Sequence, residues 1–220
     1  MKTLLLPCLL ALCVLGWRTA SPPNRSFIAK VHSECNVDGF KLALLPHQIP
    51  NNYKPFPCTY EQDKLFSGYS QRERIEILYQ LLQYEGDTSL CSKRVCRYGY
   101  TDSPYPQTKY YTTQVDALYL LTILAVGGFA SSYCPYPVLI DTVSGREIDP
   151  SSEKIAEVFA IYKAWFEENK KRGFKHFPVP LRNSRYKWYG IRKSRSYILN
   201  DTFCIPSLDK AFAVVGVCLD

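Results

Sequence analysis

Three aspartates are the candidates for acid–base chemistry in this sequence: Asp116, Asp141 and Asp149. A positioned carboxylate can act as a general acid or base, so a secreted enzyme that uses such residues is one alternative function. Asp116 lies in an apolar segment, where burial would perturb its pKa. Its spacing from Thr113 also fits the N3 and N-cap positions of a helix, and we expect the capping role.

The usual catalytic motifs are missing from the sequence. It contains no G-x-S-x-G elbow, no H-E-x-x-H pair, no P-loop and no cysteine-protease signature. The whole chain has three histidines, which leaves few members for a hydrolytic triad or a histidine metal site. The question of catalysis therefore stays open, with the missing motifs weighing against an enzyme, and we expect no cofactor.

The cysteines predict a disulfide-bonded protein. Of nine cysteines, Cys8 and Cys13 lie in an amino-terminal leader, and an odd number of seven remains. Spacing does not determine connectivity, but short loops favour three pairs: Cys35 with Cys58, Cys91 with Cys96, and Cys204 with Cys218. This pairing leaves Cys134 as a buried hydrophobe. We predict no metal site, because thiolate sites use C-x-x-C pairs or nearby histidines.

A strongly basic stretch is the main candidate for binding. Eleven basic and two acidic residues lie between Lys163 and Arg195, interleaved with aromatic residues. Such a local positive field favours anionic partners, and outside the cell these are acidic glycans or anionic cell surfaces rather than nucleic acid. A solvated face that only keeps the protein soluble is the alternative. The candidate ligand-binding residues are Lys170, Lys171, Arg172, Lys175, Arg185, Lys187, Trp188, Arg192, Lys193 and Arg195.

The amino terminus indicates export from the cell. Lys2 precedes an apolar run from Leu4 to Leu15, which is too short to span a bilayer and is typical of a signal peptide within residues 1–20. Cleavage after Gly16 or after Ala20 is compatible with the small residues there. We therefore expect a secreted, extracellular protein without a transmembrane segment, glycosylated at the two sequons that begin at Asn24 and Asn200.

The mature chain, residues 21–220, has the length of a single globular domain. A structural or defence protein that assembles through its odd cysteine is a third functional class. The oligomeric state stays open.

The elements that must position these residues indicate an α+β fold, with about three principal helices packed on a small sheet. Ser70 and Glu73 predict a capping box at the start of a first helix, with Gly86 as its C′ glycine and Ile75, Leu78, Tyr79 and Leu82 on the apolar stripe. A second, buried helix is expected from about Thr113 to Val126.

The remaining segments complete the expected fold. Val138 to Ile148 is typical of a hairpin, and a third helix follows, with Asp149 as N-cap and Gly173 at its end. Alternation over residues 183–199 predicts strands with one basic side, and Ala211 to Leu219 predicts a buried strand. Residues 21–68 show little periodicity, and we expect a loop-rich, disulfide-stapled amino-terminal region.

Overall fold

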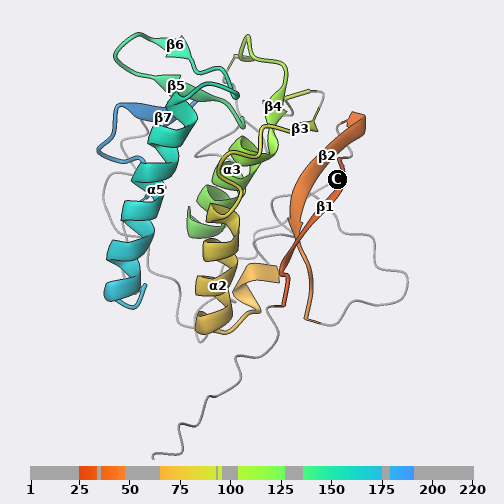
Figure 1. Ribbon diagram of the computed structural model, residues 1–220, viewed down its shortest axis with the longest axis vertical. Coiled ribbons are helices and arrows are strands. Elements are labelled where there is room, and N and C mark those ends of the chain that lie inside the picture. Colours follow the sequence, from red (N-terminus) through yellow and green to blue (C-terminus); the bar gives the residue numbers. More distant parts are fainter. Residues whose placement is uncertain are drawn as a thin grey trace, which may run out of the picture.

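A computed structural model describes residues 25–33, 36–47, 65–92, 94–95, 104–126, 136–174 and 179–190. In these ranges three helices, α2, α3 and α5, pack on one another, with a β-hairpin against one flank and a three-stranded sheet at one end (Figure 1). The mixture of helices and small antiparallel sheets confirms the predicted α+β class.

Helix α3 (Thr113–Val126) lies in the centre of the core because its sequence is apolar around most of its circumference. Every residue from Thr113 to Ala125 is buried. The helix has the bounds that the sequence predicts. Within the described ranges, no helix combines the length and the apolar character that crossing a membrane requires.

Helix α2 (Gln71–Leu82) begins with the predicted capping box. The backbone N–H of Glu73 donates to Ser70 Oγ at 3.4 Å, and the N–H of Ser70 donates to Glu73 Oε2 at 3.0 Å. Two backbone donors that the first turn leaves unpaired are thereby satisfied. This part of the prediction is confirmed.

The far end and the buried face of α2 differ from the prediction. The helix ends with Gln83 as C-cap, so Gly86 is not its C′ residue; its φ of 82° instead belongs to the following turn. Tyr79 is 46 % exposed and does not belong to the core stripe. The buried face is made by Ile77, Leu78, Leu81 and Leu82.

Helix α5 (Lys154–Lys171) begins later than predicted. Asp149 accepts a hydrogen bond from the N–H of Ser151 at 2.8 Å and so caps a preceding turn rather than the helix itself. The end is as predicted, because Gly173 follows the C-cap with a φ of 66°. The buried stripe consists of Ile155, Val158, Phe159, Tyr162, Trp165 and Phe166.

The three-stranded antiparallel sheet has the order β6-β5-β7. The predicted hairpin is present as β5 (Leu139–Asp141) and β6 (Arg146–Glu147), and β7 (Tyr186–Trp188) lies within the predicted strand region. The indole N–H of Trp188 donates to Thr122 Oγ1 and to the Tyr162 hydroxyl, each at 3.1 Å. These bonds join the sheet to α3 and α5.

Residues 28–44 form a hairpin, in a region for which the sequence predicts loops. Strand β1 (Ile28–Ser33) pairs antiparallel with β2 (Asn36–Leu44), and β2 lies against α3 and the short strand β3 (Leu90–Ser92). Strand β3 pairs in turn with β4 (Tyr111–Thr112). The expected staple between Cys35 and Cys58 lies outside the described residues.

Candidate functional site

Asp141 lies at the end of β5, where its carboxylate is engaged by cations from two other elements. Its side chain is 1 % exposed. Arg185 Nη2 lies 2.6 Å and Lys154 Nζ 3.1 Å from Asp141 Oδ2, and the N–H of Val143 donates to Oδ1 at 3.0 Å. The hydrogen bonds from Arg185 do most to hold the pKa of Asp141 far below its usual range. A carboxylate held ionised in this way serves as a structural anion that joins the end of β5 to the start of α5 and to Arg185, which directly precedes β7.

Asp116 is buried under the β1–β2 hairpin, and its carboxylate bonds to groups outside α3. Oδ2 accepts the backbone N–H of Leu42 at 2.5 Å and the thiol of Cys91 at 3.3 Å. The predicted capping box with Thr113 is therefore wrong, since the N–H of Thr113 is paired with the Ser89 carbonyl and the acid makes tertiary contacts instead. Burial raises the pKa of Asp116, and the nearby Lys41 ammonium opposes that rise.

Cys91 carries a free, buried thiol that also donates to the Phe40 carbonyl. Burial raises the pKa of this thiol strongly, with Asp116 adding to the effect, so the thiol resists ionisation. Its predicted partner, Cys96, lies outside the described residues. In this structure Cys91 is therefore a thiol rather than half of the predicted disulfide. The pairing of Cys204 with Cys218 and the glycans on Asn24 and Asn200 also lie outside the described residues and stay predictions.

Asp149, the third candidate, is exposed and bonded to Ser151. The three predicted acids thus have separate partners in separate parts of the fold. Among the described residues, no three His, Cys, Asp or Glu side chains lie together as ligands of a metal ion would.

The basic stretch is continuous in sequence, but the structure divides it between the two ends of α5. Arg185 lies beside Lys154 at the first turn of that helix, since both contact Asp141. Lys170 and Lys171 lie in its last turn. At ~1.5 Å rise per residue, about 24 Å of helix separates Lys154 from Lys170, so the described basic residues do not form one surface.

Ion pairs also neutralise part of this stretch. Arg172 pairs with Glu168 at 2.5 Å, and Lys163 pairs with Glu85. Lys170, Lys171 and Lys187 form no ion pair with a described residue. The predicted ligand contacts Lys175, Arg192, Lys193 and Arg195 lie outside the described residues.

The prediction that Trp188 contacts a ligand does not agree with its position in the core. Trp188 is 1 % exposed, and its indole packs edge-on against Tyr119 with 5.1 Å between ring centroids. The alternation in this segment places Tyr186 and Trp188 on the core face of the sheet and Lys187 on the other face. Tyr186 and Trp188, which lie between basic residues in the sequence, therefore stabilise the core.

A surface groove of about 790 Å³ runs between α2 and α5 near the carboxyl end of α5. Helix α2 lines it with Gln71, Arg72, Ile75, Glu76 and Tyr79, and α5 lines it with Phe166, Glu167 and Lys170. The Tyr79 and Phe166 rings lie 6.1 Å apart, and the Lys170 ammonium lies 5.9 Å from the centroid of the Phe166 ring. The groove combines an exposed aromatic ring with charged groups of both signs.

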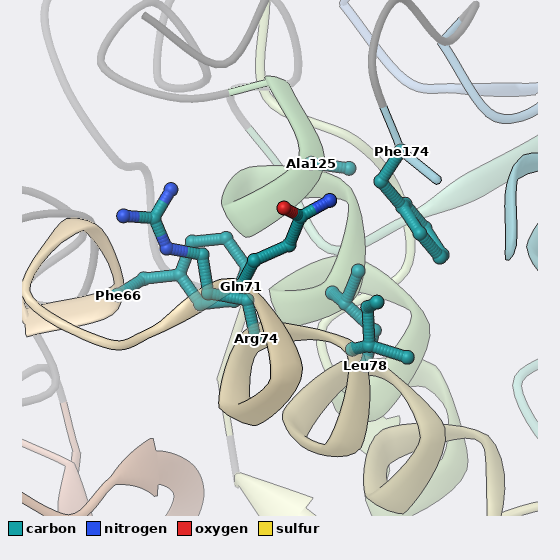
Figure 2. A pocket seen from close by; sticks show the side chains of 7 residues that line it. Phe66, Gln71, Arg74, Leu78, Ala125 and Phe174 are labelled. Carbon is teal, nitrogen blue, oxygen red and sulfur yellow. The ribbon is translucent and has the colours of Figure 1, made fainter. Parts of the chain in front are cut away.

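An apolar niche adjoins the groove and shares Gln71 and Ile75 with it. Side chains from α2, from α3 and from the turn after α5 surround it (Figure 2). The N–H of Phe174 donates to the Asn169 carbonyl at 2.9 Å, a Schellman closure that turns the chain after Gly173. The remaining lining residues are Phe66, Arg74, Leu78, Ala125 and Phe174.

No protein-family model, curated protein or solved structure matches this chain.

Of the groove residues, Lys170 is a ligand contact predicted from the sequence, whereas Arg72 and Tyr79 are not among the predicted contacts. The spacing of Tyr79, four residues after Ile75, predicts a place on the core stripe. The sequence feature that indicates an exposed Tyr79 is the pair of apolar residues Ile77 and Leu81, because they move the centre of the buried face away from Tyr79.

Proposed function

We propose that this chain is a secreted binding protein that holds an acidic glycan in the groove between α2 and α5. An acidic glycan is the class of partner that the basic stretch predicts, and its contact lies near the carboxyl end of α5. Secretion is part of the proposal and rests on the leader and the sequons in the sequence.

The observation that carries the proposal is a pair of cations, one on each wall of the groove, that have no acidic partner among the described residues. Arg72 on α2 and Lys170 on α5 form no ion pair with any described residue, whereas Arg172, Lys163 and Arg185 are paired with acids. When a cation has no acidic partner, no carboxylate competes with an anionic ligand for its hydrogen bonds. A carboxylate or sulfate on a glycan supplies that partner.

The other groups of the groove suit a sugar. The exposed ring of Tyr79 offers a flat apolar face with a polar hydroxyl at one end. Glu76 and Glu167 on opposite walls offer acceptors, and sugar hydroxyls are donors. A ligand with both hydroxyls and negative charges therefore fits this lining better than a simple polyanion does.

Binding to acidic glycans tests the proposal. We expect the purified chain to bind heparin or an unsulfated polymer of glucuronate and N-acetylglucosamine, and to stay bound above physiological salt. Lys170→Glu and Arg72→Glu should each weaken the affinity at least about tenfold, because each variant loses one charge-assisted hydrogen bond and places a carboxylate against the anionic ligand. The dissociation constant is measured by calorimetry.

Lys187→Glu is the matched control, because it changes the net charge equally but lies on β7 at the other end of α5. It should bind nearly as well as the unmodified chain. Failure of both glycans to bind, or an equal loss in all three variants, would refute the groove as the site.

A further inference from the structure

The niche beside the groove is small and has an apolar lining. It offers about 10 Å³ of free volume, close to the room that one water or methyl group needs. The lining that faces this space is apolar. A water there would lack the two to four polar partners that buried waters have, so an apolar occupant is favoured.

Gln71 stands between the niche and the groove with its amide held in place. Its Nε2 donates to the Gly173 carbonyl, which links the first turn of α2 to the turn after α5. The Oε1 atom makes no hydrogen bond to a described residue. It is therefore an acceptor beside an apolar space, the arrangement that an N–H followed by a short acyl group requires.

We infer that the ligand is a glycan with N-acetylated amino sugars, whose acetyl methyl group enters the niche while the amide N–H donates to Gln71. This inference rests on the proposed function, since the charged groups of the glycan occupy the groove. The niche then acts as a size filter. It admits one methyl group and excludes a longer acyl chain.

The test varies the acyl group and keeps the charge constant. The probes are the glucuronate–N-acetylglucosamine polymer and the same polymer with N-propionyl groups. We expect the N-propionyl form to bind about tenfold more weakly, because one extra methylene in a filled pocket has an effect of this size. Equal affinity for the two polymers would overturn the inference and leave the proposed function standing, whereas no binding of either polymer or of heparin would overturn both.

A variant of the niche provides a second test. Its readout is the ratio of the affinities for the N-acetyl and N-propionyl polymers, which a partial loss of folded protein does not change. Ala125→Gly removes one methyl group from the wall, and we expect it to reduce the preference for N-acetyl over N-propionyl at least threefold. Ala156→Gly, on the exposed face of α5 three turns before the groove, is the control for the loss of helix propensity and should keep the original preference. An unchanged preference in Ala125→Gly would overturn the inference.

Discussion

Two opposed effects act on the pKa of the Asp141 carboxyl group. Removal from water favours its neutral form, whereas the Arg185 guanidinium, the Lys154 ammonium and the Val143 N–H favour the anion. The second effect is larger, so the pKa lies below that of an aspartate in the unfolded chain. Folding stability is therefore linked to pH through this residue.

We predict that Asp141→Asn changes the pH profile of stability. A depressed pKa stabilises the native state fully above the unfolded-state pKa of about 4, and this contribution is lost as the pH falls toward the folded-state value. The variant should melt at a lower temperature than the unmodified chain at pH 7, and the difference should shrink between pH 5 and pH 2. Thermal melts followed by circular dichroism measure it.

The exposed carboxylate Glu167, which has no ion pair with a described residue, provides the control. Glu167→Gln should leave the melting temperature close to that of the unmodified chain over this range. A gap between Asp141→Asn and the unmodified chain that stays constant from pH 7 to pH 2 would show that the Asp141 charge does not stabilise the fold.

Helix α2 shows how a local signal fixes an element. The capping box of Ser70 and Glu73 holds the first turn on which Arg72, one of the two groove cations, is carried. Ser70→Ala should lower the free energy of unfolding by about 1 kcal/mol, the usual effect of losing an N-cap side chain. Ser70→Asn keeps an oxygen that can accept from Glu73 and should retain most of the stability.

Urea titration of the three proteins measures this difference. Equal losses in Ser70→Ala and Ser70→Asn would contradict the capping role, because the variant that keeps an accepting oxygen would then be no more stable than the variant that lacks one.

The elements that the sequence predicts well are those with a local cause. The apolar circumference of the segment from Thr113 to Val126 and the periodicity after Pro150 determine two helices without any knowledge of their partners. The β1–β2 hairpin was missed because its strand pattern is weak and its buried face depends on packing against α3. Asp116 was misassigned for the same reason, since its partner Leu42 lies 74 residues away.

At the scale of the molecule, distance along the chain misleads about distance in space. The sequence predicts one basic surface, but Lys170 lies in the last turn of α5, whereas Arg185, which directly precedes β7, lies beside Lys154 at the first turn. The groove instead joins residues of α2 and α5 that lie about ninety positions apart in sequence. Two of its cations form no ion pair with a described residue: Lys170 belongs to the predicted basic stretch, whereas no local pattern in the sequence marks Arg72.

Hydrogen exchange with and without the glucuronate–N-acetylglucosamine polymer tests the central claim most directly, because it locates the ligand on the fold. We predict slower amide exchange in α2 and in the turns from Phe166 to Phe174, with no change in β5 and β7. Protection centred on β5 and β7, or no protection anywhere in the chain, would contradict a glycan site between α2 and α5.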